Sequence, residues 1–241
     1  MGVFAFFLRD ITRRLFLRIA GGVIFMAAVP STVYGFFVKS LPVRTVEKGG
    51  FRFNRDKGLI EWQEGPPEAY RLVADGLLRE PKTFSYADIK AFPQIEQVSD
   101  FHCVEGWSVK DIKWGGFRFS SILERVEPES TADHVLFHSF GATDYKPGGW
   151  GHYIESFPLS ELLDPGREII LALTMDDRPL PEANGGPLRL ISPYDLAYKS
   201  IKFVTRMEFV KGERPGWWTL ANPIYTIKAR VPEGRLRKRS N

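Results

Sequence analysis

Cysteine is almost absent from this sequence, and its scarcity removes several classes of site. Cys103 is the single cysteine among 241 residues, so the chain cannot close an intramolecular disulfide. One thiol is also too few for a cysteine-rich zinc or iron–sulfur site, and the Cys-x-x-Cys-His motif of covalently attached haem is missing. If Cys103 has a chemical role, its partners are other residue types or a bound group.

The sequence also lacks a uniform excess of positive or negative charge along its length. The net charge is +4, but residues 1–35 carry +3 and residues 228–241 carry +5, so residues 36–227 carry −4. Duplex recognition needs a contiguous basic face, so this distribution argues against a nucleic-acid partner. The basic tail over 228–241 is typical of a solvated end, with a weak contact to anionic lipid as the alternative. Disorder is excluded, because 44% of the residues are hydrophobic and 14% are aromatic.

Residues 1–37 have the layout of an export segment. Arg13 and Arg14 precede an apolar run from Ile19 to Phe37, which is the order of a basic region and a hydrophobic stretch in export signals. The adjacent arginines resemble the twin-arginine signal of bacteria, which implies export of a folded protein to the periplasm. An uncleaved membrane anchor is the alternative, since this run nearly spans a bilayer, although Pro30 and three glycines weaken such a helix.

The remaining chain divides into an irregular lead-in over 38–68, a domain over 69–227 and the basic tail over 228–241. Ser85 has the spacing of an N-cap and predicts a short helix that ends before Pro93, and residues 121–124 predict another. Strands are expected at residues 70–73, 94–102, 134–140, 168–175, 188–191 and 201–210, with a turn at 75–76. Many strands and few short helices predict an α+β domain dominated by mixed sheet.

Cys103 stands at the end of an expected strand, and three interpretations of it are open. A free cysteine is commonly a small buried hydrophobic residue. As a nucleophile it would need a histidine base, and His138 or His152 are candidates, since the adjacent His102 points to the opposite face of a strand. As a soft metal ligand it would act alone, with the other ligands supplied by a cofactor.

Five ordered sequence blocks between Ala69 and Tyr225 make this region resemble one known family. They are the segment 70–88, Cys103-Val104-Glu105-Gly106-Trp107-Ser108, Asn184-Gly185-Gly186-Pro187-Leu188-Arg189-Leu190, Tyr198-Lys199-Ser200-Ile201-Lys202, and Glu213-Arg214-Pro215 followed by Trp218-Thr219-Leu220-Ala221. Together they resemble the molybdopterin-binding domain of the sulfite oxidase fold family, and within it the periplasmic catalytic subunits that reduce protein methionine sulfoxide. The resemblance implies a mixed-sheet molybdopterin-binding domain with short helices.

The resemblance also implies roles for particular residues. Cys103 would be the protein thiolate on one molybdenum per chain, completed by the dithiolene sulfurs of molybdopterin. The Gly185–Gly186 pair would let the backbone approach the pterin closely. The cofactor contacts would come from Ser139, Asn184, Arg189, Ser200, Ile201 and Lys202. The charged side chains among them would bind the phosphate end.

Departures from the family pattern narrow the expected activity. Residues 47–54 replace an asparagine-rich segment that contacts the cofactor in the subgroup, and the arginine-rich run that follows the cysteine in sulfite-oxidising members is absent. The expected activity is therefore oxygen-atom transfer that reduces an S-oxide or N-oxide, rather than sulfite-type oxidation. A haem-containing or quinone-linked membrane protein is the implied electron donor. The alternative from another class is an exported or tethered binding module that keeps the fold without metal chemistry.

Overall fold

The computed structural model describes residues 50–222 and 224–236, all within a unit that runs from Arg44 to Asn241. The export segment expected over 1–37 lies outside these residues. None of the helices in the described part of the chain has the length and apolar character needed to cross a membrane.

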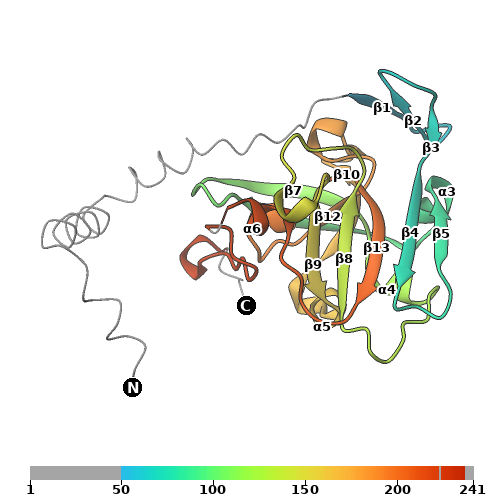
Figure 1. Cartoon of the computed structure of the whole chain (residues 1–241). Helices are drawn as coiled ribbons and strands as arrows, with labels where there is room; N and C mark the ends of the chain where they lie inside the picture. The colour runs from blue at the N-terminus through green and yellow to red at the C-terminus, as the bar shows by residue number, and fades with distance from the viewer. Residues whose placement is uncertain (1–49, 223, 237–241) are drawn as a thin grey trace, which may run out of the picture. The chain divides into compact units, whose positions relative to one another are not determined.

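A five-stranded mixed sheet forms one side of the fold (Figure 1). Its strands lie in the order β5-β4-β13-β8-β9, with β4 parallel to β13 and every other pair antiparallel. The bounds are β4 Arg71–Gly76, β5 Lys82–Ser85, β8 His134–Ser139, β9 Ile154–Pro158 and β13 Val204–Val210. The mixed pairing confirms the α+β class that the sequence predicts.

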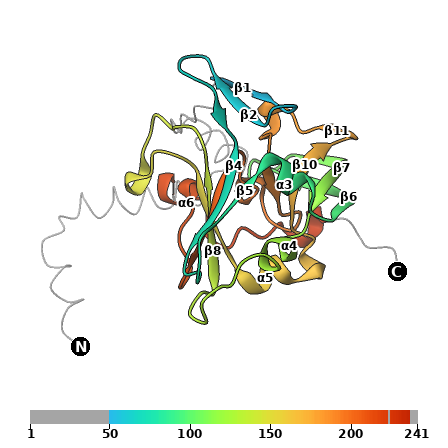
Figure 2. The ribbon, with the colours of Figure 1, turned by 90° about the vertical axis from the view of Figure 1, so that its right-hand side faces the viewer.

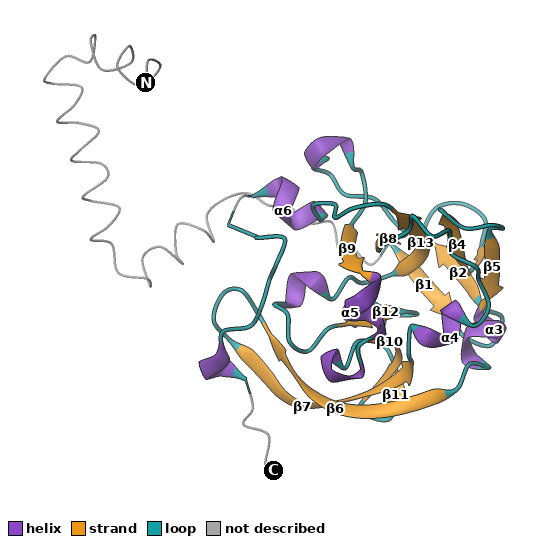
Figure 3. Ribbon diagram, turned by 90° about the horizontal axis from the view of Figure 1, so that it is seen from below, coloured by secondary structure: helices purple, strands orange, loops and turns teal. Residues whose placement is uncertain are grey.

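A second sheet carries the cysteine. Its order is β11-β10-β7-β6, and β12 also pairs with β10. The bounds are β6 Gln94–His102, β7 Ser108–Phe117, β10 Ile170–Met175, β11 Arg178–Pro179 and β12 Arg189–Ile191. Strands β6 and β7 form the long curved pair of Figure 3, and Cys103 lies directly after β6.

The lead-in over 38–68 is not irregular in its described part, which corrects the sequence-based expectation. A three-stranded antiparallel sheet forms there from β1 Phe51–Asn54, β2 Leu59–Trp62 and β3 Glu68–Ala69 (Figure 2). Phe53 is 2% exposed and its ring packs edge-on against Tyr70 and Tyr86. These aromatic contacts anchor the sheet, because burying an aromatic ring in a core contributes strongly to stability.

The helices are short, as the sequence predicts. They are α3 Tyr86–Lys90, α4 Ser120–Leu123, α5 Leu159–Leu163 and α6 Trp217–Ala221, with 3-10 turns η1 Pro147–Gly149, η2 Pro165–Arg167, η3 Glu182–Asn184, η4 Ala197–Lys199 and η5 Glu233–Arg235. The Ser85 capping box is confirmed, because its hydroxyl accepts from the backbone N–H of Asp88 and the Asp88 carboxylate accepts from that of Ser85. Helix α4 starts one residue before its expected position and has no side-chain cap.

Strand positions follow the predictions closely in the second half of the chain. The strand expected over 134–140 is β8, and its residues from Val135 to Ser139 are all buried, so both faces of the strand are covered. The turn expected at 75–76 is a further correction, because β4 runs through Asp75 to Gly76, and both residues pair with β13. A core cluster between β7, β10 and β12 contains Ile112, Trp114, Ile170, Ala172, Leu180 and Ile191.

The described part of the basic tail is not a solvated end, which is another correction. Ala229 and Val231 are 2% and 5% exposed, so the segment packs into the fold. Val231 donates its backbone N–H to the Tyr194 carbonyl, and the Ala229 carbonyl accepts from Leu196. Apolar residues between the charges explain the difference, since Ala229 and Val231 are buried while the Arg230 side chain forms ion pairs with Glu161 and with the buried Asp195.

Candidate functional site

Cys103 begins a tight turn that joins β6 to β7. Its backbone N–H donates to the Trp107 carbonyl at 2.9 Å, and its carbonyl accepts from the Gly106 N–H at 3.2 Å. Gly106 has φ +97°, a left-handed conformation that glycine adopts without steric cost. The turn leaves Cys103 half-buried, and this burial raises the pKa of its thiol. A cation bound at the sulfur would reverse that effect by favouring the thiolate.

Cys103 lies on the wall of a cavity of about 380 Å³. One wall is the Cys103 turn, with Trp107 and Glu105, whose side chains are joined by a hydrogen bond from the indole N–H. Another wall is the segment from Ala197 to Lys202, and aromatic side chains of Trp218 and Tyr225 complete the lining. The volume falls within the range of small-molecule and cofactor sites.

Four of the expected cofactor-contacting residues line this cavity together with Cys103. They are Arg189, Ser200, Ile201 and Lys202. Arg189 is 6% exposed and donates to the carbonyls of Ser200 and Asn184 at 3.1 Å and 2.8 Å. Its guanidinium also lies 4.6 Å from the ring centroid of Phe101, a cation–π contact. The structure thus brings together residues that lie almost one hundred positions apart in the sequence.

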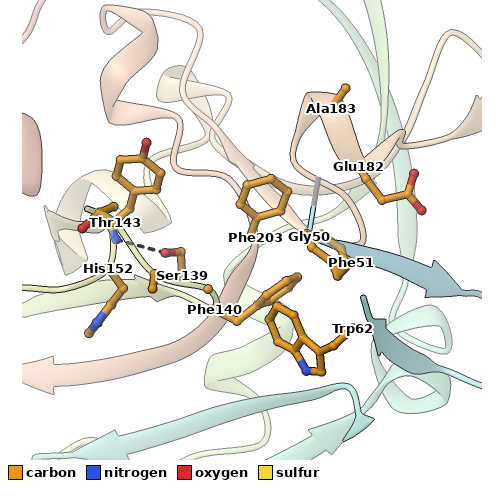
Figure 4. Close-up of a pocket in the computed structure, with 13 residues that line it drawn as sticks. Gly50, Phe51, Trp62, Ser139, Phe140, Thr143, His152, Glu182, Ala183 and Phe203 are labelled. Atoms are coloured by element: carbon orange, nitrogen blue, oxygen red, sulfur yellow. Dashed lines mark hydrogen bonds between the residues drawn. The ribbon is translucent and has the colours of Figure 1, made fainter. Parts of the chain in front are cut away.

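Ser139 and Asn184 do not line the Cys103 cavity. Ser139 lines a neighbouring cavity of about 370 Å³, where its hydroxyl accepts from the Tyr153 backbone N–H at 3.1 Å (Figure 4). The aromatic rings of Phe51, Trp62, Phe140 and Phe203 lie along this second cavity. Tyr153 contributes to both linings. Asn184 is in neither lining, and its carbonyl is the acceptor for Arg189.

The Gly185–Gly186 pair is needed by the protein's own packing. A Cβ on Gly185 would lie 2.6 Å from the side chain of Lys202, and a Cβ on Gly186 would lie 2.2 Å from the Leu180 carbonyl oxygen. Gly185 also has φ +103°. These contacts within the chain are sufficient to account for both glycines.

None of the four histidines lines the Cys103 cavity. His102 is hydrogen-bonded to the Ser108 hydroxyl at 2.8 Å. His138 contacts His152 at 3.0 Å and Glu208 at 3.1 Å, in the region of the second cavity. A cysteine nucleophile needs a base within hydrogen-bond reach. The geometry therefore disfavours the cysteine–histidine interpretation of Cys103.

The residues around Cys103 fit a metal that brings most of its own ligands. Among the described residues, no group of three or more His, Cys, Asp or Glu side chains is arranged to hold a metal ion. One soft sulfur donor lines a cavity together with Arg189 and Lys202, whose charges suit an anionic ligand, and with Ser200, whose hydroxyl accepts from the Ser192 N–H at 3.1 Å. This donor set fits a dithiolene cofactor with a phosphate end.

Sequence reasoning missed several residues that complete the site. Tyr153 follows a glycine-rich stretch without any local motif, and Tyr225 stands only at the edge of the matching blocks. Arg235 was counted as part of a solvated tail, yet its guanidinium donates to the carbonyls of Cys103 and Trp107. Backbone carbonyls are the acceptors here, so no residue-type pattern could have revealed this contact.

Comparisons with known proteins agree with the motif analysis. Residues 60–218 match the family "Oxidoreductase molybdopterin binding domain". The protein-methionine-sulfoxide reductase catalytic subunit MsrP of Ralstonia nicotianae is 31% identical over 209 residues, which are 82% of this chain and 62% of that protein. The MsrP of Pseudomonas syringae pv. tomato is 32% identical over 193 residues, 75% of this chain and 56% of that protein. The chain thus spans about 60% of the length of these curated relatives.

A solved structure shares the fold. The sulfane dehydrogenase SoxCD from Paracoccus pantotrophus superposes with a TM-score of 0.51 and 19% identity, covering 59% of this chain and 38% of that one. At this identity the likeness concerns the fold alone. The family match over most of the described residues, the fold and the ordered motifs lead to one conclusion. The chain belongs to the oxidoreductase molybdopterin-binding domain family, with the α+β sulfite-oxidase-type fold that its motifs predict.

Proposed function

We propose that this chain is a molybdenum-dependent oxidoreductase that reduces S-oxides, with a methionine sulfoxide-like group as the substrate. One observation carries the proposal. The single thiol of the chain faces Arg189, Ser200, Ile201 and Lys202 across one cavity. The relatives named as methionine-sulfoxide reductase subunits support the choice of substrate and of direction.

In this proposal each wall of the cavity has its own task. Cys103 would be the thiolate ligand to molybdenum, and Arg189, Ser200 and Lys202 would bind the phosphate end of molybdopterin through charge-assisted hydrogen bonds. Ile201 would pack against the cofactor, and Asn184 would act through its backbone carbonyl, which accepts a hydrogen bond from Arg189. Ser139 would contact the cofactor from the second cavity.

The chemistry divides between cofactor and protein. When bound, the molybdenum–molybdopterin cofactor supplies oxygen-atom transfer, which with two electrons and two protons converts an S-oxide into a thioether and water. The aromatic side chains of Trp107, Trp218 and Tyr225 in the lining would give a thioether an apolar surface. Burial raises the pKa of Tyr225, and nearby Cys103 raises it further, so its hydroxyl keeps its proton and can donate to the S-oxide oxygen.

Electrons for this reaction come from a partner in our proposal. The single cysteine leaves no set of thiolates for an iron–sulfur cluster. A haem-containing or quinone-linked membrane protein would deliver them, and the twin-arginine-type segment would place the chain in the periplasm, either free or tethered by that segment.

The first test is molybdenum per chain, measured by elemental analysis on protein from a host that makes molybdopterin. We expect about one atom per chain in the wild type and a large loss in Cys103→Ser, in which the fold stays intact by circular dichroism. Reduction of free methionine sulfoxide with a reduced viologen dye as artificial donor then tests the substrate. A metal-free wild type from a competent host would instead support a binding module that keeps only the fold.

A further inference from the structure

The C-terminal segment 229–235 joins the two walls of the Cys103 cavity. Residues 229–231 attach to the segment that directly precedes η4, and η4 belongs to one wall of the cavity. Arg230 donates to the Asp195 carboxylate at 2.8 Å, and the backbone pairs with Tyr194 and Leu196, directly before Ala197. Asp195 is 3% exposed and also accepts from Arg167 and Ser192. This attachment therefore rests on a buried, hydrogen-bonded carboxylate.

The second half of the segment ends on the opposite wall. Arg235 donates from Nη1 to the Cys103 carbonyl at 3.0 Å and from Nη2 to the Trp107 carbonyl at 2.7 Å. Nη2 also lies 3.1 Å from the Ser108 hydroxyl, which is hydrogen-bonded to His102. Both carbonyls belong to the turn that presents the thiol, and both also accept its internal hydrogen bonds.

A guanidinium suits this position for a geometric reason. Its planar fork holds several N–H donors at fixed angles, so one side chain can bind two carbonyls and a hydroxyl together. A lysine ammonium offers a point charge without that fork. The contact therefore constrains the conformation of the turn, and it does so from a segment more than one hundred residues away in sequence.

We propose that segment 229–235 is a strap that sets the spacing between the Cys103 turn and the Ala197–Lys202 wall, with Arg235 as the positioning residue for the thiolate. The strap would hold the turn in the conformation that accepts the metal before any cofactor binds. The proposal rests on the proposed function for the identity of the bound group. The fixing of the turn by Arg235 does not depend on it.

The test compares full-length wild type, Arg235→Ala and Arg235→Lys, with Arg79→Ala as the matched control. Arg79 is a suitable control because its pair with Glu127 is largely exposed, and the variant removes the same charge. Hydrogen–deuterium exchange of the Cys103 and Gly106 amides reports on the turn. We expect exchange about tenfold faster in Arg235→Ala, since a charge-assisted hydrogen bond is lost, a smaller increase in Arg235→Lys and none in Arg79→Ala.

A second readout separates positioning from general stability. In Arg235→Ala the paramagnetic resonance signal of the partly reduced protein, normalised to molybdenum, should broaden or split, while the melting temperature stays close to that of wild type. Unchanged exchange at Cys103 and Gly106 would overturn the strap even if the wild type holds molybdenum and reduces sulfoxides. A metal-free wild type with faster exchange in Arg235→Ala would instead keep the strap and reject the proposed function.

Discussion

The two neighbouring cavities share Tyr153 but differ in the charge of the side chains that line them. The Cys103 cavity has cationic side chains on one wall, and the segment that carries them is anchored by buried ion pairs. The Ser139 cavity also has aromatic rings, but among the described residues its lining contains no lysine or arginine, and its polar side chains include His152 and the carboxylate of Glu182 (Figure 4). Burial followed by the charge of Arg206 lowers the pKa of His152, which favours its uncharged form.

This difference shows where the fold places buried charges. Lys199, which directly precedes Ser200, and Glu155 are 5% and 1% exposed and form an ion pair at 2.6 Å. Burial raises the pKa of Glu155, and Lys199 counteracts this. Buried pairs tolerate little change, because removing one partner strands the other in a low-dielectric interior. The Lys199–Glu155 pair is therefore a sensitive part of the frame that holds the Ala197–Lys202 wall of the Cys103 cavity.

The largest expected effect comes from breaking that frame. Lys199→Met should lower the free energy of unfolding by about 3–5 kcal/mol, because it leaves the Glu155 carboxylate buried and unpaired. Denaturant unfolding followed by fluorescence measures the loss. The double variant Lys199→Met/Glu155→Gln should recover part of it by removing the stranded charge, and equal losses in both variants would contradict this explanation.

The second largest effect is expected from acid, which should lower the stability of the fold through His138, next to Ser139. Burial lowers the pKa of His138 to about 4, with Arg206 and His152 adding to the shift and Glu208 opposing it. Below the ordinary value of 6.5 the unfolded state binds a proton that the folded state does not, so stability falls as the pH drops from 6.5 to 4. The loss should reach about 3 kcal/mol.

The measurement is the unfolding free energy of wild type and His138→Gln between pH 7 and pH 4. The His138→Gln variant should lose less stability over this range, because residue 138 no longer carries a ring that titrates. Identical slopes in the two proteins would show that groups other than His138 cause the acid effect.

A smaller effect is expected at Arg189. Arg189→Lys should cost about 2 kcal/mol, because it loses the fork that reaches both the Ser200 and Asn184 carbonyls. Molybdenum per chain should fall with it, since the loop that would bind the phosphate end loses its support. Full metal content in this variant would make Arg189 a purely structural residue.

Ser139→Ala should have the smallest effect. It removes the acceptor for the Tyr153 N–H and should cost about 1 kcal/mol. Molybdenum content should change less than in Arg189→Lys. A greater metal loss in Ser139→Ala would reverse the ranking of the two cavities and make the second one the main cofactor contact.

Local features of the fold could be predicted from the sequence because their causes are local. The Ser85 capping box needs only two side chains three residues apart, and it is present. Strand β6 has the predicted bounds of Gln94–His102. The hairpin of β1 and β2 was missed although Phe51 and Phe53 alternate with Arg52, because its stability comes from distant rings such as Tyr86.

The candidate site could not be predicted from residues that are close together in the sequence. Spacing along the chain does not place Cys103 beside Ser200, and only the family resemblance implied that these segments meet. The contacts of Arg235 with Cys103 and Trp107 left no signature, since they end on backbone carbonyls that every residue possesses. Charge counting indicated a solvated tail, because it ignores the apolar residues Ala229 and Val231 that bury the segment.

Tyr153 has a geometric consequence for both cavities. Its ring stacks on Trp218 at an interplanar angle of 10° and meets Trp217 edge-on, so it is held on one side by indoles. Because the same side chain belongs to both linings, the two volumes are not independent. A rotation of this ring that enlarges one chamber takes room from the other, so the largest ligand each can admit is set by a shared residue.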